Sequence, residues 1–158
     1  MGAGTIIATA IAITLLILTG YVLIFGTLST ARIVAMAQQA AADREAQKIH
    51  TRIEIFGAST NTTSVQTFIE VNNTGSEVVG DFDHMEVYLL QGGFPYTYTN
   101  QSGTWNYAIH PDQVHPNLFD PDEVVNITVL YDPTRGPPTW VKVTTANGVY
   151  DSAYTVVT

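Results

Sequence analysis

The sequence predicts an all-β fold, an immunoglobulin-like antiparallel β-sandwich, carried on a long N-terminal transmembrane and stalk α-helix. Residues 1–31 contain no Asp, Glu, Lys, Arg or His, so every charged side chain lies from Arg32 onward. From residue 51 the hydrophobic period changes from helical to two, which is typical of half-buried strands. We therefore expect a short N-terminus (1–5), a transmembrane helix (6–28), a helical stalk (29–50) and a β-sandwich domain (51–158).

The apolar run from Ile6 to Leu28 is long enough to cross a membrane. Its 23 residues span roughly 34 Å as a helix, against about 30 Å for a hydrocarbon core. A cleaved signal peptide has a basic leader and an apolar core of about 7 to 15 residues. Because only Met1–Thr5 precede the run and none of them is basic, we interpret it as an uncleaved anchor.

The helix is expected to continue beyond the membrane as a stalk. Residues 29–50 lack Gly and Pro and are rich in strong helix formers. We therefore expect one continuous helix from about Gly4 to about Ile49.

The remainder of the chain alternates β-branched or aromatic residues with polar ones, between turn-forming residues. This pattern predicts eight strands of a sandwich. The expected strands are 52–58, 65–72, 84–90, 96–100, 105–109, 125–131, 140–146 and 149–157. Asn147-Gly148 predicts a type I′ hairpin turn, because both residues accept a positive φ.

Alternation along these strands identifies the side chains that should be buried. The expected large core residues are Phe68, Val87, Leu89, Trp105, Ile127, Val129, Trp140 and Val143.

The predicted domain is strongly acidic. From Glu54 onward there are twelve Asp and Glu residues against Arg135 and Lys142, so the net charge is −10 (2 − 12). Such a surface repels phosphate backbones, which excludes a nucleic-acid partner. The chain has no Cys, which excludes disulfides and thiolate metal sites.

The sequence contains no recognisable catalytic constellation. His84, His110 and His115 lie on separate elements, and no Gly-x-Ser-x-Gly motif is present. Asp120, Asp122 and Glu123 could offer oxygen ligands to Ca²⁺, but their spacing is not that of a calcium loop, and turn chemistry explains them better. We expect no enzyme activity, no cofactor and no small-molecule substrate.

Two signals bear on orientation in the membrane. Four Asn-x-Ser/Thr triplets, possible N-glycosylation sites of an exported domain, begin at Asn61, Asn72, Asn100 and Asn126. The basic residues that follow the anchor, with Arg32 nearest to it, favour the opposite orientation. Since Asp43 and Glu45 dilute that bias, we expect the N-terminus inside the cell and the domain outside.

Three stretches together resemble the FlaF and FlaG families, accessory proteins of the archaeal swimming filament. They are the charge-free N-terminal helix without a processable leader, residues 68–90 and residues 141–157. The resemblance implies a stator role that links the motor to the surface layer, outside the cytoplasmic membrane. It also implies two protein partners, a homologous archaellum accessory subunit and a surface-layer protein, within a homo- or hetero-oligomer. The families' Pro-Gly-Glu turn is here Pro121-Asp122-Glu123, with Asp122 at the Gly position.

Two other readings stay open. Archaellins and archaeal pilins share the layout of an apolar helix followed by a β-sandwich, and the first residues resemble a mature archaellin N-terminus. Against a filament subunit stand the absence of a basic leader before Met1 and the acidic residues of the stalk, which would need partners in a helix core. A surface-bound solute-binding module would need a deep pocket with convergent polar groups.

Overall fold

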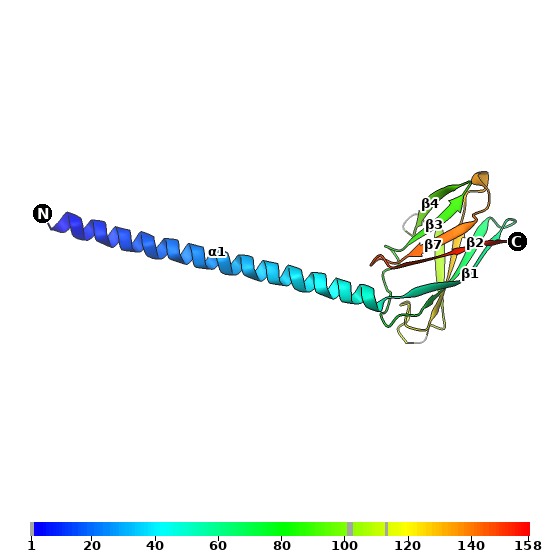
Figure 1. The fold of residues 1–158 in the computed structure, drawn as a ribbon, viewed down its shortest axis with the longest axis horizontal. Coiled ribbons are helices and arrows are strands. Elements are labelled where there is room, and N and C mark those ends of the chain that lie inside the picture. Colours follow the sequence, from blue (N-terminus) through cyan, green and yellow to red (C-terminus); the bar gives the residue numbers. More distant parts are fainter. Residues whose placement is uncertain (1, 101–102, 113) are drawn as a thin grey trace. The chain divides into compact units, whose positions relative to one another are not determined.

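A computed structural model describes residues 2–100, 103–112 and 114–158. The chain forms two compact units, one up to Asp43 and one over Arg44–Thr158. Helix α1 (Ala3–His50) runs without interruption through the end of the first unit into the second, which confirms the predicted continuous helix (Figure 1). Because α1 contains 48 of the 158 residues, the description all-β holds only for residues 51–158.

The β domain is built from two sheets, which confirms the predicted sandwich. One sheet has the strand order β5-β6-β2-β1-β9 and the other the order β4-β3-β7-β8. The strands are β1 (Ile53–Asn61), β2 (Gln66–Asn73), β3 (Glu86–Gln91), β4 (Phe94–Thr99), β5 (Trp105–His110), β6 (Val124–Leu130), β7 (Trp140–Thr144), β8 (Tyr150–Tyr154) and β9 (Val156–Val157).

The predicted last strand is in fact two strands in different sheets. Strand β8 pairs with β7, whereas β9 pairs with β1 in parallel, so the sandwich is not wholly antiparallel as predicted. The crossing occurs at Thr155, whose N–H donates to the carbonyl of Thr139 and whose hydroxyl donates to the carbonyl of Pro138. These two hydrogen bonds hold the chain where it passes from one sheet edge to the other.

Six of the eight predicted core residues are buried, and two are not. Val87, Leu89, Trp105, Ile127, Val129 and Val143 are at most 1% exposed. Phe68 was predicted wrongly, since it is 39% exposed, and Trp140 is only half-buried. On β2 the inward face is filled by Thr67, Ile69 and Val71, and on β7 by Val141 and Val143. Strand alternation therefore turns the two large aromatic side chains outward.

The β7–β8 hairpin is present, but its turn is not of type I′. Gly148 has φ +84°, whereas Asn147 is not among the non-glycine residues with positive φ. The Asn147 side chain instead accepts a hydrogen bond from Thr145 Oγ1 (2.6 Å) and donates one to Thr51 Oγ1 (2.7 Å). Asn147 thus fastens the hairpin to the start of the domain.

The loop after β2 encloses the C-terminal end of α1. The carbonyl of His50 accepts hydrogen bonds from the N–H groups of Ser76 (2.9 Å) and Glu77 (3.2 Å). The carbonyl of Arg52 accepts from Thr74 (2.9 Å) and Gly75 (3.0 Å). The bonds to His50 satisfy a carbonyl that the helix end otherwise leaves without a partner, and those to Arg52 hold the segment that follows the helix. A Cβ at Gly75 would lie 2.5 Å from both Arg52 N and His50 O, so only glycine fits this approach.

We expect Gly75→Ala to lower the free energy of unfolding of the β domain by about 2 kcal/mol or more, because the new methyl group collides with backbone atoms that cannot move aside. The measurement is urea unfolding of the full chain in detergent micelles, followed by the fluorescence of Trp105 and Trp140. Ser76→Ala is the control, because Ser76 is exposed and its change should stay within about 0.5 kcal/mol. Equal stability of the two variants would contradict the account of the junction.

Candidate assembly surfaces

Helix α1 presents apolar side chains that the rest of the chain does not cover. No described residue of α1 is buried, and the helix is long and apolar enough to cross a membrane. The threonine hydroxyls of its apolar part donate to backbone carbonyls of the preceding turn, for example Thr14 to Ala10 (2.9 Å) and Thr19 to Leu15 (2.7 Å). These internal bonds lower the cost of placing hydroxyls in an apolar medium. The helix is therefore suited to a lipid or protein environment outside its own chain.

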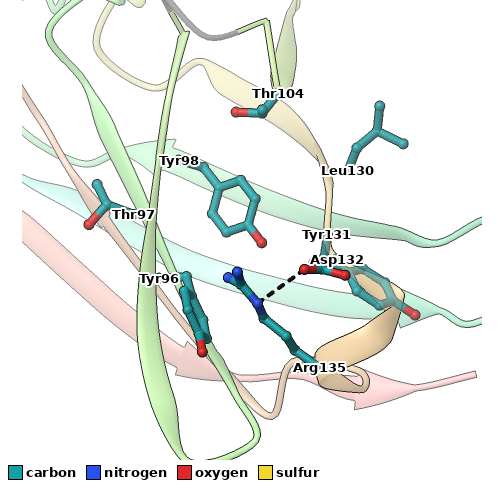
Figure 2. Close-up of a pocket in the computed structure, with 8 residues that line it drawn as sticks. All are labelled: Tyr96, Thr97, Tyr98, Thr104, Leu130, Tyr131, Asp132 and Arg135. Atoms are coloured by element: carbon teal, nitrogen blue, oxygen red, sulfur yellow. Dashed lines mark ion pairs between the residues drawn. The ribbon is translucent and has the colours of Figure 1, made fainter.

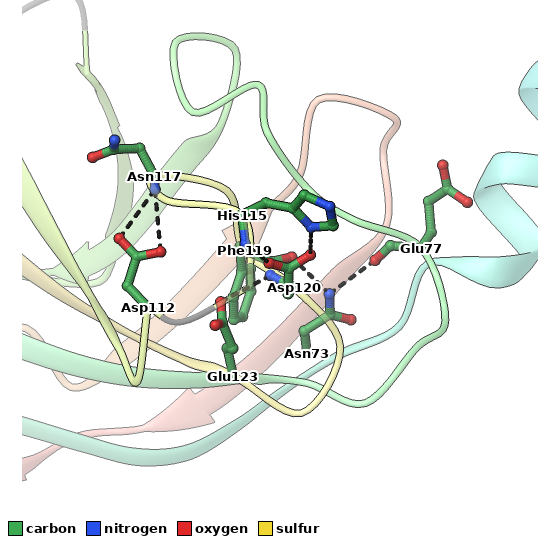
Figure 3. A network of polar contacts seen from close by, with 8 residues as sticks. All are labelled: Asn73, Glu77, Asp112, His115, Asn117, Phe119, Asp120 and Glu123. Atoms are coloured by element: carbon green, nitrogen blue, oxygen red, sulfur yellow. Dashed lines mark hydrogen bonds and ion pairs between the residues drawn. The ribbon is translucent and has the colours of Figure 1, made fainter.

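A buried polar network joins the end of β2 to the loop before β6 (Figure 3). Asn73 has no exposed surface. Its Nδ2 donates to the carbonyls of Glu77 (2.9 Å) and Phe119 (3.0 Å), and its Oδ1 accepts from Gly75 N (3.1 Å). Its backbone N–H donates to the Glu123 carbonyl (3.1 Å). Asn73 thus connects three chain segments that the strand pattern alone does not bring together.

The acidic residues proposed as calcium ligands form part of this network. Asp120 accepts hydrogen bonds from His115 N (3.0 Å) and pairs with His115 Nδ1 (2.8 Å), and its own N–H donates to Glu123 Oε2 (3.0 Å). Asp122 is exposed. Among the described residues no group of three or more His, Asp or Glu has the arrangement of a metal site. The calcium interpretation stays a prediction.

Asp122 takes the backbone conformation that its position demands. Its φ is +65°, in the left-handed region that glycine adopts most readily. Asp is one of the few other residue types that enter this region at modest cost. The turn therefore keeps the geometry expected of a glycine at the corresponding position of the Pro-Gly-Glu turn.

The four predicted glycosylation triplets lie at different kinds of position, and all four asparagines are half-buried. Asn61 is at the turn after β1, where its Oδ1 accepts from Thr63 N (2.9 Å) and Ser64 N (3.0 Å). Asn72 and Asn126 lie within the five-stranded sheet, and the Oδ1 atom of each is buried. The other two residues of the Asn100 triplet, 101 and 102, lie outside the described residues. Whether any triplet is glycosylated stays a prediction.

The three histidines of the domain lie apart, as the sequence indicated. His84 is exposed and pairs with Asp81 at 2.8 Å, and this contact raises the pKa of His84 and lowers the pKa of Asp81. His115 belongs to the Asn73 network, and His110 is exposed at the end of β5. Among the described residues, the side-chain partners of His84 and His115 are carboxylates and not hydroxyl nucleophiles.

An aromatic face that no sequence pattern indicated lies on the outer side of the four-stranded sheet. It is formed by Tyr88, Trp140, Lys142, Tyr150 and Tyr154. Tyr150 and Tyr154 are 61% and 83% exposed. The Lys142 ammonium lies 4.0 Å from the centre of the Tyr150 ring and 5.5 Å from that of Tyr88. Exposed tyrosine and tryptophan of this kind are enriched in protein interfaces. The aromatic face is therefore a candidate contact surface.

Comparison with known proteins identifies the family. The model of the archaeal-type flagellin family matches residues 2–154, which include both the helix and the β domain. The chain belongs to the archaeal-type flagellin family. An uncharacterized protein of Archaeoglobus fulgidus is 24% identical over 156 residues, covering 97% of this chain and 95% of that protein.

Two solved structures from Sulfolobus acidocaldarius are similar to this archaeal-type flagellin family member. They are the archaellum periplasmic stator protein complex of FlaF and FlaG (TM-score 0.50, 21% identity, 65% of this chain and 87% of that one) and the stator protein FlaG (TM-score 0.49, 22% identity, 65% and 97%). The first shows that the fold is shared. The family match and the shared fold together confirm the resemblance found in the sequence, and flagellins are structural proteins.

Replacing Asn73 by Asp should destabilise the β domain of this flagellin-family chain by about 2 to 4 kcal/mol, because a carboxylate oxygen would face the carbonyls of Glu77 and Phe119. Urea unfolding of the full chain measures the loss. Asn106→Asp makes the same chemical change on the exposed side of β5 and should leave stability within about 0.5 kcal/mol. A loss of similar size in both variants would show that the Asn73 hydrogen bonds make no specific contribution to the stability of the domain.

Proposed function

We propose that this chain is a structural component of the archaeal motility apparatus, which anchors the archaellum motor to the cell envelope. Helix α1 would be held in the cytoplasmic membrane with its N-terminus inside, and the β domain would make protein contacts outside. The observation that carries the proposal is the charge-free run of α1, with no buried residue, within a match to the archaeal-type flagellin family. An uncovered apolar helix of this length requires a lipid or protein environment.

The charges of the second half of α1 support a stalk in water. Asp43, Arg44, Glu45 and Lys48 are all exposed. Buried in a bundle of helices, each would need a partner to offset the cost of removing it from water. In water they need none, and they add weak ion pairs along the helix. A membrane anchor followed by a hydrated stalk accounts for this change of composition.

The partners we propose follow from the aromatic face and from the fold. Exposed Tyr150, Tyr154 and half-buried Trp140 suit a protein contact. The similar stator proteins FlaF and FlaG form a complex. By analogy, a homologous archaellum accessory subunit would bind the domain in a homo- or hetero-oligomer, and a surface-layer protein would be the outer attachment. The Asn-x-Ser/Thr triplet at Asn61, at the end of β1, supports placement of the domain outside the cell. The triplets at Asn72 and Asn126 add little, because the Oδ1 atoms of these residues are buried in the sheet.

A second candidate function is a filament subunit with α1 in the filament core. It is favoured by the match of an archaeal-type flagellin model to the apolar helix itself, from residue 2 onward. Shearing the cells separates the two functions. A stator component stays with the membrane fraction, whereas a filament subunit is recovered as a main constituent of the sheared filaments.

The stator proposal predicts that removal of the β domain abolishes rotation of the filaments but not their assembly. In cells whose chromosomal copy ends after Arg52, we expect filaments in near-normal number and a loss of swimming, because the anchor remains while the outer contacts are absent. Electron microscopy counts the filaments, and tracking of single cells scores rotation. Unimpaired swimming would contradict the proposal. Loss of the filaments themselves would favour the filament-subunit function.

A further inference from the structure

An open pocket lies between strand β4 and the segment at the end of β6 (Figure 2). Its volume is about 480 Å³. One wall consists of Tyr96 and Tyr98 from β4, and the opposite wall of Leu130 and Tyr131 at the end of β6. The charged groups of the pocket are Asp132 and Arg135. None of these residues belongs to the Asp120–Glu123 turn, to the four Asn-x-Ser/Thr triplets or to the aromatic face.

The guanidinium group of Arg135 lies in this pocket and makes two contacts there, although the side chain is partly exposed. It stacks on the Tyr96 ring, with 3.9 Å from Cζ to the ring centre, and its Nε lies 3.0 Å from Asp132 Oδ2. In Figure 2 its terminal nitrogens lie on the side of Tyr98. Within the described part of the chain these terminal nitrogens have no hydrogen-bond partner. A planar guanidinium with both ends of its fork available matches a carboxylate.

Asp132 keeps this arginine in place and is itself anchored. Its Oδ1 accepts hydrogen bonds from Thr134 N (2.9 Å) and Thr134 Oγ1 (2.6 Å). These bonds, with a smaller contribution from Arg135, hold the pKa of Asp132 below its ordinary value. The carboxylate is therefore charged at neutral pH and offers an acceptor beside the arginine fork.

The size and walls of the pocket indicate what kind of molecule would carry the bound carboxylate. Ligand pockets usually have volumes of about 300 to 1,000 Å³, more than one acidic side chain fills. The Tyr96 ring is covered by Arg135, so the open apolar walls are Tyr98 on one side and Leu130 with Tyr131 on the other. These walls suit a saturated sugar ring, whose C–H groups form an apolar face. Hydroxyl groups on such a ring could bond to Asp132.

We propose that this pocket binds a carboxylated sugar of the hexuronic acid type, with the carboxylate on the Arg135 fork, the ring between Tyr98 and Leu130, and a hydroxyl on Asp132. The acidic domain repels free anions in general, but at about 0.1 M salt charges beyond about 10 Å are largely screened. The binding depends on local contacts. The sugar-binding proposal is independent of the proposed motility role, and it can be tested on the purified protein.

The test uses the full chain in a detergent without a sugar headgroup, at physiological salt. Saturation-transfer NMR with methyl β-D-glucuronide, methyl β-D-glucoside and N-acetylglutamate amide compares the carboxylated ring, the neutral ring and the carboxylate without a ring. We expect the glucuronide to bind at least tenfold more tightly than either of the others. Arg135→Gln should weaken glucuronide binding at least tenfold.

Lys142→Gln is the matched control, because Lys142 is also a cation stacked on a tyrosine but lies outside the pocket. It should leave the affinity unchanged. Arg135→Lys keeps the charge without the planar fork and should weaken binding several-fold, so it serves if Arg135→Gln does not fold. No signal from the glucuronide, equal binding of the glucoside, tighter binding of the glutamate compound, or an unchanged affinity in the folded Arg135 variants would each overturn the proposal.

Discussion

The apolar half of helix α1 determines what this protein must be. It contains no charged residue before Arg32, and the chain buries none of its described side chains. Roughly 25 cal/mol for each Å² of exposed apolar surface makes such a helix insoluble on its own. Something outside the chain must cover it, and a membrane or a bundle of like helices are the environments that do so. The archaeal-type flagellin family match extends over this same helix.

The two lateral edges of the β-sandwich, at β8 with β9 and at β4, differ in how they are covered. On one side Asp151 of β8 accepts a hydrogen bond from Ile55 N of β1 (2.7 Å), and β9 crosses to extend the sheet of β1. On the other side the edge strand β4 carries Pro95, which suits an edge because it has no N–H to offer. The pocket of Arg135 lies on this second side (Figure 2). One side is thus sealed by side-chain and strand contacts, and the other is left accessible.

The features predicted correctly from sequence are those with a strong local period. The charge-free run and the helix formers gave α1 within a residue at each end, and alternation gave the strands and six of eight core residues. Phe68 and Trp140 were predicted wrongly because the alternation of each strand has the opposite phase: Thr67 and Ile69 face inward on β2, and Val141 and Val143 face inward on β7. The crossing at Thr155 depends on hydrogen bonds to residues 138 and 139, which no local pattern reveals.

The candidate surfaces were harder to predict for the same reason. Asn73 looks like an ordinary turn asparagine, and only the fold brings the carbonyls of Glu77 and Phe119 to its Nδ2. Arg135 and Tyr96 are distant in sequence and meet only across the gap between the sheets. The conformation of Asp122 could be anticipated from the family's glycine, since the position demands a positive φ whichever residue occupies it.

Cysteine labelling tests the central claim most directly, because the chain has no cysteine of its own. Phe94→Cys places a thiol on the β domain at a position that is 67% exposed and lies outside the aromatic face, and Leu16→Cys places one on α1 at a position 76% exposed within its own chain. Cells stripped of their surface layer would be treated with a membrane-impermeant maleimide. The account predicts rapid labelling of the first variant and protection of the second. Labelling of Leu16→Cys in intact cells, or protection of Phe94→Cys until the cells are lysed, would contradict it.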